Sequence, residues 1–255
     1  MKTEARDAPR TVLVTGASRG IGAATAQLCA QGGWAVAVNY ASDAAAAQRV
    51  VSAIRATGGK ALALQADVAD STQVDMMFKR IDAELPALGA LVNNAGVIDL
   101  PSRVDAMNAQ RLQRMFAINV FGSFFCAREA VRRLSTAKGG AGGAIVNLSS
   151  AAARLGSPGQ YVDYAAAKAA IDTFTLGLAK EVATEGIRVN AVRPGIIDTE
   201  IHASGGLPDR ARQVAPQVPM QRAGSAMEVA QAIVWLLSDE ASYTTGSMLD
   251  VAGGR

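Results

Sequence analysis

The feature that most constrains the fold of this chain is the regular return of short apolar runs between longer stretches of helix-forming residues. The apolar runs lie at 11–15, 34–39, 61–66, 90–94, 144–149 and 187–192, with a seventh at 247–251. Their length and composition predict strands. The stretches of helical length between them include 43–56, 71–85, 108–135 and 161–184. Strands that alternate with helices indicate a parallel sheet covered on both faces.

Right-handed crossovers between parallel strands leave a doubly wound sheet or a closed barrel as the main choices. No repeat, low-complexity tract or linker divides the chain, so we expect a single α/β domain over 10–255 after an N-terminal tail at 1–9. The irregular stretch at 198–222 contains Gly205-Gly206 and three prolines. A loop of that length is usually functional, which predicts a substrate lid. The alternative is a mobile surface excursion.

Charge and hydropathy exclude several classes of partner. The chain of 255 residues has a net charge of only +3, and its densest basic cluster, Arg128 with Arg132 and Arg133, also contains Glu129. This pattern predicts no nucleic-acid partner. Residues 20–42 carry no charge, but glutamines and a Gly-Gly pair interrupt them. They predict a helix, a turn and a strand, with no membrane span.

Cysteine usage and the first residues predict a cytoplasmic location. The two cysteines, Cys29 and Cys126, are 97 positions apart in apolar stretches, and no Cys/His cluster suggests a metal site. A reduced protein is the simplest interpretation. The first ten residues carry acidic and basic side chains before any apolar run, so they lack the order of a signal peptide.

A glycine-rich turn, TGASRGIG at 15–22, follows the first predicted strand and precedes a helix. Glycines there let backbone N–H groups approach a pyrophosphate, and the helix N-terminus places partial positive charge beneath it. The turn therefore predicts a nucleotide site, with simple strand-to-helix packing as the alternative. Its G-x-x-x-G-x-G spacing departs from the usual G-x-G-x-x-G fingerprint.

A second motif pairs Tyr164 with Lys168, four residues apart in a helical stretch, so both side chains project from one face. Ser150 stands at the end of the fifth predicted strand, and Asn119 lies in the preceding long helix. The carboxyl ends of parallel strands form the ligand crevice of an open α/β sheet, which favours a catalytic site. The alternative is a surface pair in which the lysine stem packs beside the tyrosine ring.

With these motifs the chain resembles the short-chain dehydrogenases/reductases from Arg10 to Arg255. The landmarks stand in the family's order: TGASRGIG, Ala66-Asp67-Val68, NNAG at 93–96, Asn119, Ser150, Tyr164 with Lys168, and RPGIIDT at 193–199. The resemblance implies a Rossmann-like, doubly wound fold with a seven-stranded parallel sheet. It also implies a nicotinamide cofactor, and hydride transfer between a carbonyl and an alcohol.

The resemblance also implies roles for the four catalytic candidates. Tyr164 would be the general acid or base, and Lys168 would bind the nicotinamide ribose. A lysine ammonium about 4 Å from the phenol would lower the tyrosine pKa by up to about three units. Ser150 would hydrogen-bond the substrate oxygen, and Asn119 would hold a water. Many members place the serine 13 residues before the tyrosine, whereas Ser150 is 14 before it, so Ser149 remains the alternative.

The cofactor preference follows from charge. An enzyme selective for NAD usually ends its second strand with an acid that grips the ribose, but here that position reads Asn39, Tyr40, Ala41 and Ser42. Arg19 in the glycine turn offers a guanidinium to a phosphate. Both features favour NADP(H), unless Arg19 only points to solvent. The full set of expected cofactor contacts is Gly16, Ser18, Arg19, Gly20, Ile21, Gly22, Asn39, Tyr40, Ala41, Ser42, Asp67, Val68, Asn94, Ala95, Gly96, Tyr164, Lys168, Pro194, Gly195, Ile197 and Thr199.

The substrate and the assembly remain open at this level. The alternatives to a general carbonyl or alcohol substrate are a 3-oxoacyl thioester, a sugar, or no reaction at all in a dinucleotide-sensing protein. The family resemblance suggests a homotetramer built from long helices and the C-terminal strand region. Two predicted helices carry more apolar residues than one sheet-facing stripe requires, and burial of the others against another subunit would support this assembly. The apolar residues are Met115, Phe116, Val120, Phe121, Phe124 and Phe125 in 108–135, and Ile171, Phe174, Leu176 and Leu178 in 161–184.

Overall fold

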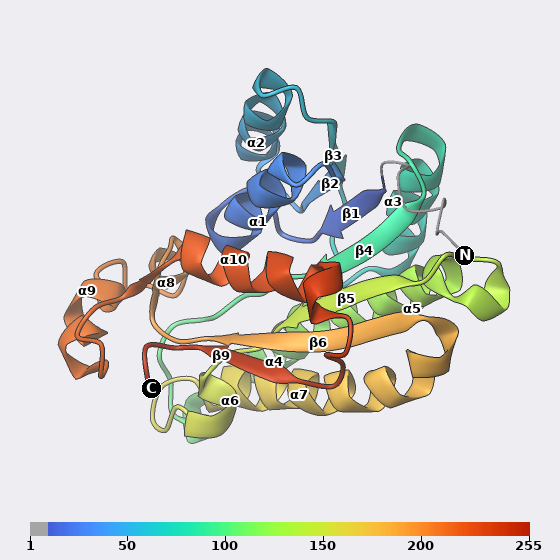
Figure 1. The fold of residues 1–255 in the computed structure, drawn as a ribbon. Helices are drawn as coiled ribbons and strands as arrows, with labels where there is room; N and C mark the ends of the chain where they lie inside the picture. The colour runs from blue at the N-terminus through green and yellow to red at the C-terminus, as the bar shows by residue number, and fades with distance from the viewer. Residues whose placement is uncertain (1–9) are drawn as a thin grey trace.

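The computed structural model describes residues 10–255, apart from the side chains of residues 202 and 204, so the predicted tail at 1–9 lies outside the described residues. Within that range, seven parallel strands form one sheet in the order β3-β2-β1-β4-β5-β6-β9 (Figure 1). The strands are β1 (Thr11–Val14), β2 (Ala35–Tyr40), β3 (Ala61–Gln65), β4 (Leu88–Asn93), β5 (Gly143–Leu148), β6 (Ile187–Pro194) and β9 (Met248–Val251). The predicted doubly wound sheet is confirmed.

Helices cover both faces of this sheet (Figure 1). The longer ones are α1 (Gly20–Gln31), α2 (Ala44–Ala56), α3 (Ser71–Glu84), α4 (Ala109–Phe116), α5 (Gly122–Leu134), α7 (Val162–Val182) and α10 (Ala226–Leu237). Alternate strand residues point to opposite faces. Val12 and Val14 therefore pack into the core under α1, α2 and α10, while Leu13 packs into the core under α3, α5 and α7.

The predicted helix at 108–135 is interrupted. Helix α4 runs into a π-helical segment, Ala117–Phe121, before α5 begins. Asn119 lies in this segment, and its Nδ2 donates to the carbonyl oxygens of Met115 at 2.9 Å and Val97 at 3.0 Å. A side chain that bonds the backbone four residues earlier competes with the regular helical ladder. The irregular turn thus places Asn119 against the loop after β4.

The stretch at 198–222 is less irregular than its sequence indicates. It contains α8 (Ile201–Ser204), α9 (Arg210–Val214) and a 3-10 turn (Ala215–Gln217), all too short for a periodic pattern. The strand β7 (Ile197–Asp198) pairs with β8 (Gly224–Ser225), so the stretch leaves and rejoins the domain at one place. The remaining short elements are α6 (Ala152–Leu155) and the 3-10 turns Val104–Ala106, Thr136–Lys138, Ala183–Glu185 and Asp239–Ala241.

Buried polar contacts fix α7 relative to the sheet. The Nδ2 of Asn93 donates to Asn147 Oδ1 at 2.9 Å, and Asn147 Nδ2 donates to Thr175 Oγ1 at 2.9 Å. At the other end of α7, Arg111 Nε lies 2.7 Å from Asp163, whose side chain is fully buried. Charged hydrogen bonds of this kind are strong when both partners are desolvated. They hold the first turn of α7, which carries Tyr164.

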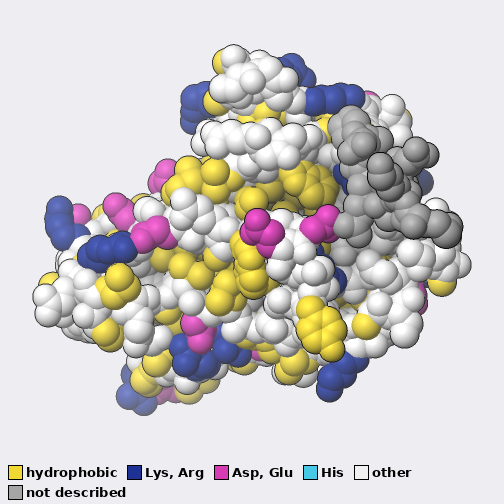
Figure 2. All heavy atoms as spheres, viewed as in Figure 1, with side chains coloured by type: hydrophobic (Ala, Val, Ile, Leu, Met, Phe, Trp, Pro, Cys, Tyr) yellow, Lys and Arg dark blue, Asp and Glu magenta, His cyan; other side chains and the backbone are white. Residues whose placement is uncertain are grey.

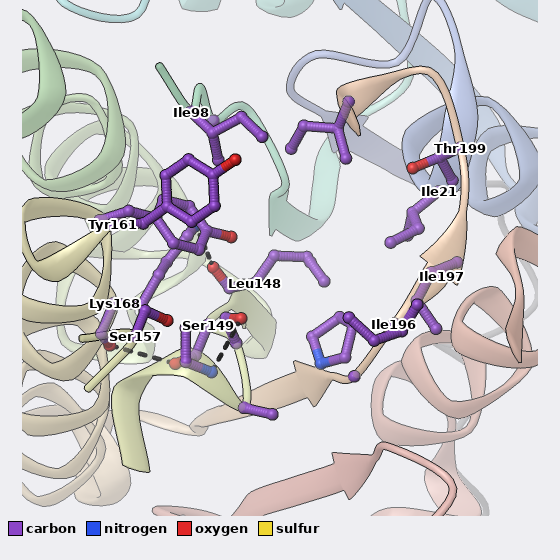
Figure 3. Close-up of a pocket in the computed structure, with 18 of the residues that line it drawn as sticks. Ile21, Ile98, Leu148, Ser149, Ser157, Tyr161, Lys168, Ile196, Ile197 and Thr199 are labelled. Carbon is purple, nitrogen blue, oxygen red and sulfur yellow. Dashed lines mark hydrogen bonds between the residues drawn. The ribbon is translucent and has the colours of Figure 1, made fainter. Parts of the chain in front are cut away.

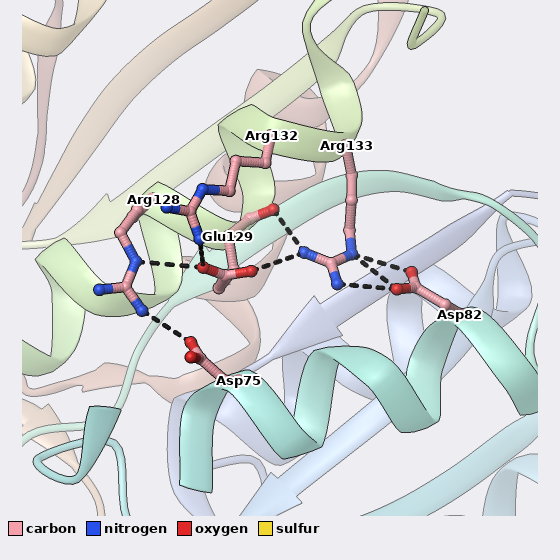
Figure 4. A network of polar contacts seen from close by, with 6 residues as sticks. All are labelled: Asp75, Asp82, Arg128, Glu129, Arg132 and Arg133. Atoms are coloured by element: carbon pink, nitrogen blue, oxygen red, sulfur yellow. Dashed lines mark hydrogen bonds and ion pairs between the residues drawn. The ribbon is translucent and has the colours of Figure 1, made fainter. Parts of the chain in front are cut away.

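The basic cluster of the sequence is a salt-bridge network between α3 and α5 (Figure 4). Arg128, Arg132 and Arg133 all contact the carboxylate of Glu129. Arg128 also pairs with Asp75, and Arg133 pairs with Asp82. Burial raises the pKa of Glu129, but hydrogen bonds from Arg133 and Arg128 outweigh burial and hold that pKa below its ordinary value. These arginines are therefore neutralised within the protein.

Three further sequence predictions concern a membrane span, the two cysteines and a metal site. Residues 20–42 form α1, a turn and β2, and among the described residues no helix is long and apolar enough to span a membrane. Cys29 and Cys126 are free and buried. No group of three or more metal-binding side chains occurs in residues 10–255 outside the undescribed side chains.

Candidate active site

A pocket opens at the carboxyl ends of the strands, between α7 and the chain that follows β6. Figure 3 shows Tyr161 and Lys168 on one wall, with Ile196, Ile197 and Thr199 facing them across the cavity. Ser149 and Ser150 follow the end of β5 and line the floor. This is the edge at which parallel sheets bind ligands, because the loops there converge from several strands.

Tyr164 is one of the residues that line this pocket. Burial raises the pKa of its phenol to about 12, and the hydrogen bond with the Ser150 side chain offsets only part of that effect. The phenol is therefore protonated near neutral pH. The sequence predicts that the Lys168 ammonium lowers the pKa of Tyr164, and the structure differs. Desolvation has the largest effect on this pKa and raises it, and the group that acts to lower it is Ser150.

Lys168 is 4% exposed, and its Nζ donates to the carbonyl oxygen of Leu148 at 2.7 Å. Its Nζ is 5.6 Å from the centre of the Tyr164 ring. Burial lowers the pKa of Lys168 to about 8, while the negative charge of Asp172 acts in the opposite direction. Asp172 is itself held by Arg193, whose Nη2 lies 2.8 Å from its Oδ2. At pH 7 the lysine is thus still mostly charged, and it loses its charge as the pH rises through about 8.

The two adjacent serines differ in what their hydroxyls contact. Ser149 is 3% exposed, and its Oγ donates to the backbone oxygen of Lys168 at 3.1 Å. Ser150 is half-buried, its Oγ accepts from the backbone N–H of Ala152, and it hydrogen-bonds Tyr164. The geometry therefore favours Ser150 as the residue that meets a substrate oxygen, despite the extra residue before Tyr164.

Asn119 does not line the pocket but supports it from behind. Its Oδ1 accepts from the backbone N–H of Val97 at 3.2 Å. A Cβ on Gly96 would stand 2.8 Å from that Oδ1 and 3.4 Å from Lys168 Nζ. Only glycine fits between these two side chains without displacing one of them. Asn119 therefore shapes the loop that separates it from Lys168.

The glycine turn is held open by contacts with the loop after β4. Asn94 Nδ2 donates to the backbone oxygens of Thr15 at 2.7 Å and Gly16 at 3.0 Å. A Cβ on Gly22 would stand 2.5 Å from Asn94 Nδ2 and 2.6 Å from Gly16 O. The glycine turn leads directly into the N-terminus of α1, where the first backbone N–H groups and the positive end of the helix dipole suit a pyrophosphate. The residues present fit a dinucleotide.

The end of β2 carries no carboxylate. Asp43, the first acid after it, accepts from the backbone N–H of Ala46 and caps α2. Tyr40 is half-buried, and Ala41, Ser42 and Arg19 are exposed beside the glycine turn. These positions offer no negative charge to repel a 2′-phosphate.

Three of the predicted cofactor contacts have structural partners of their own. Asn39 is 1% exposed, its Oδ1 accepts from Gly16 N, and its Nδ2 donates to Ala66 O, so its side chain braces the glycine turn. Val68 is 5% exposed and packs against Gly122. Asp67 is exposed, and its Oδ1 accepts from Ala69 N. The atoms of Asn39 and Val68 are thus largely engaged within the fold.

The pocket brings together residues from distant parts of the sequence. The predicted positions that line it are Ile21, Asn94, Gly96, Ser150, Tyr164, Lys168, Pro194, Gly195, Ile197 and Thr199. Gly16, Ser18, Arg19, Gly20, Gly22 and Ala95 lie in or against the neighbouring glycine turn instead. The lining residues that sequence reasoning missed include Ile98, Leu155, Tyr161, Ile196, Arg210 and Arg255. No motif marks them, because they come from loops and short helices.

Comparisons with known proteins agree with this geometry. Residues 16–255 match the family model described as enoyl-(acyl carrier protein) reductase. The chain is 60% identical over 243 residues to the uncharacterized oxidoreductase YgfF of Escherichia coli K12, covering 95% of this chain and 98% of that one. It is 39% identical to the 3-oxoacyl-[acyl-carrier-protein] reductase FabG of Staphylococcus aureus Mu50, covering 96% and 97%. A short-chain dehydrogenase from Burkholderia cenocepacia J2315 in complex with NADP superimposes with a TM-score of 0.87 at 34% identity, covering 96% and 97%.

Proposed function

The chain belongs to the short-chain dehydrogenase/reductase family, and from that premise we propose that it is an NADP(H)-dependent oxidoreductase with Tyr164 as its acid/base. The observation that carries the proposal is the pocket in which Ser150, Tyr164 and Lys168 converge beside the glycine turn. Family membership makes the chain an oxidoreductase that uses a nicotinamide cofactor. The substrate is a small molecule with a carbonyl or a secondary alcohol.

The side chains divide the work of such a reaction. A nicotinamide bound in the pocket supplies or accepts the hydride. Tyr164, protonated because its pKa is about 12, gives its phenolic proton to the carbonyl oxygen. Ser150 holds the same oxygen through its hydroxyl, and Lys168 binds the nicotinamide ribose through its Nζ. Gly96 and Asn119 fix the loop behind Lys168 so that its Nζ stays within reach of the cofactor.

The preference for NADP(H) rests on charge at the end of β2. Asp43 is engaged as the cap of α2, and Arg19 stands at the N-cap of α1, exposed beside the glycine turn. Asp67 and Val68 would flank the adenine. Titration of NADPH and NADH by calorimetry tests this preference, and Arg19→Ala should weaken NADPH selectively. Equal affinity for the two cofactors would contradict it.

Replacement of the tyrosine tests the catalytic assignment. Tyr164→Phe should lower turnover by at least about 100-fold, the loss expected for a general acid, while cofactor binding changes little. A panel of ketones, aldehydes, sugars and acyl thioesters, followed by NADPH consumption, supplies the substrate. Tyr243→Phe, which changes a fully exposed tyrosine that does not line the pocket, is the matched control. Turnover of Tyr164→Phe within a few-fold of the parent would refute the role.

A 3-oxoacyl thioester is the second candidate substrate, because the relative from Staphylococcus aureus is named for that reaction. An acidic carrier protein would dock on basic side chains beside the pocket, where Arg210 and Arg255 are found. The three arginines of α5 are committed to Glu129, Asp75 and Asp82. The acyl thioesters in the panel decide between the two candidates.

We also propose that the protein works as a cytoplasmic homotetramer. Phe121 just before α5, Phe124 on α5 and Leu176 on α7 are 53%, 45% and 41% exposed. Three of the apolar residues that the sequence analysis assigned to a subunit interface, Met115, Val120 and Ile171, are instead buried in the core. Figure 2 shows a second gathering of hydrophobic side chains over the face that carries α10, where Met227 and Trp235 are exposed. Light scattering should give about four times the 26.2 kDa mass of the chain, and a stable monomer would refute the assembly.

A further inference from the structure

The pocket extends past Tyr164 to a wall that the proposed chemistry does not use. This part of the pocket is lined by Tyr161, Arg210 and Arg255 and by the apolar side chains of Ile98 and Leu155, and Ile196 faces Tyr161 across the cavity. The residues that face the cofactor, such as Ile21 and Asn94, come from the other end of the pocket near the glycine turn. The far wall therefore belongs to the substrate.

Tyr161 presents a hydrogen-bond donor without an acceptor. It is only 5% exposed, and within the described part of the chain its buried hydroxyl has no hydrogen-bond partner. Burial raises the pKa of this phenol, so it stays protonated near neutral pH. A buried polar group is almost always satisfied in a native protein, because an unmade hydrogen bond is costly. The missing acceptor is expected to come from what the pocket binds.

In the described part of the chain, the two arginines that line this pocket have no side-chain carboxylate partner. The guanidinium carbon of Arg210 is 5.2 Å from the centre of the Tyr161 ring, and its Nη2 donates only to the neutral amide oxygen of Gln160. The Nη1 of Arg255 is buried and has no acceptor among the described residues. Both side chains therefore keep N–H donors, and both lie where water is partly excluded.

The carboxylates near this wall are already engaged. Asp163 pairs with Arg111, Asp209 pairs with Arg212, and Asp250 lies near Arg154 and Arg193. Among the described residues that line the pocket, none is Asp or Glu. A guanidinium in such a setting is best compensated by an anion that accepts hydrogen bonds through two oxygens.

We propose that the substrate is an oxo carboxylate, whose carboxylate accepts hydrogen bonds from Tyr161 and Arg210 while its carbonyl lies against Ser150 and Tyr164. This inference rests on the proposed reductase function and names its substrate class. Ile98, Leu155 and Ile196 contact the apolar carbons between the two groups. Arg255 adds positive potential to the same pocket. Tyr161 and Arg210 are thus specificity-determining residues.

Turnover of matched substrates tests the proposal. Straight-chain oxo carboxylates should be reduced with a kcat/KM at least about tenfold above that of their methyl esters, the effect of one charged hydrogen bond. Arg210→Met and Tyr161→Phe should each remove most of this preference through KM, and leave the esters within about twofold. Gln213→Met, an exposed position on the same short helix, is the control and should change neither. Equal kcat/KM of the parent for acids and esters would overturn the proposal. So would variants Arg210→Met and Tyr161→Phe that lose kcat/KM equally on acids and on esters. Better reduction of phosphonates than of carboxylates would also overturn it.

A binding measurement separates this proposal from the reductase function. Calorimetry of the protein saturated with NADP, titrated with saturated straight-chain carboxylates or their amides, needs no turnover. Tighter binding of the carboxylate in the parent, and its loss in Arg210→Met, would support the anionic subsite even if no oxo compound were reduced. In that case only the reductase function would fail. Equal binding of carboxylate and amide would refute the subsite, whatever the enzyme reduces.

Discussion

Burial of Lys168 predicts that cofactor affinity falls as the pH rises through about 8. The pKa of this lysine is lowered to about 8 because its ammonium is desolvated. Its ammonium is about 90% populated at pH 7 and about 10% at pH 9. If the charged form donates the hydrogen bonds to the cofactor, the dissociation constant of NADPH should rise up to about tenfold between these pH values, or about 1.4 kcal/mol.

Calorimetric titration with NADPH at pH 7 and pH 9 measures this change directly. The 2′-phosphate titrates near pH 6 and stays ionised over this window. Burial raises the pKa of both Cys29 and Cys126 to about 12, so these thiols stay neutral. Lys168→Met should bind more weakly at pH 7 and lose the pH dependence. Lys180→Met, an exposed position on the same helix, is the control. A constant affinity in the parent, or the same pH dependence in Lys168→Met, would refute the reasoning.

Three further predictions concern the supports of the site. Arg111→Ala should destabilise the protein by about 3 to 5 kcal/mol in urea, because it leaves the buried Asp163 carboxylate uncompensated, and a loss below about 1 kcal/mol would count against that role. Glu129→Gln should cost about 1 to 2 kcal/mol at pH 7, since three partly exposed arginines lose the charged acceptor that the buried Glu129 provides. The folded-state pKa of Glu129 is lowered, so its contribution to the free energy of unfolding is present above the unfolded pKa of about 4.3 and should vanish as the pH falls through the folded-state pKa. A stability difference between the parent and Glu129→Gln that persists in acid would contradict this. Gly22→Ala should weaken NADPH binding at least about tenfold in calorimetry, because its Cβ would stand 2.5 Å from Asn94 Nδ2 and displace the glycine turn; unchanged affinity would show that the turn adapts.

The fold class and the main motifs can be predicted from local patterns in the sequence. Each strand is a short apolar run, because both faces of the sheet are covered by helices, and the stretches between the runs have helical length. The glycine turn and the Tyr164/Lys168 pair are local as well. Their chemistry depends on residue type and spacing within one turn of chain, so they are visible without the tertiary structure.

Which atoms remain available for chemistry depends on packing between segments that are distant in sequence. Ser149 and Ser150 are adjacent, but the packing of α7 on β5 occupies the first hydroxyl and leaves the second beside Tyr164. Tyr161 lacks a lysine four residues on and has no motif, yet packing places its hydroxyl in the pocket without a partner. Burial likewise raises the pKa of Tyr164 and lowers the pKa of Lys168, because desolvation disfavours the charged form of each. Desolvation and hydrogen-bond satisfaction depend on neighbours that are distant in sequence, so no local pattern encodes them.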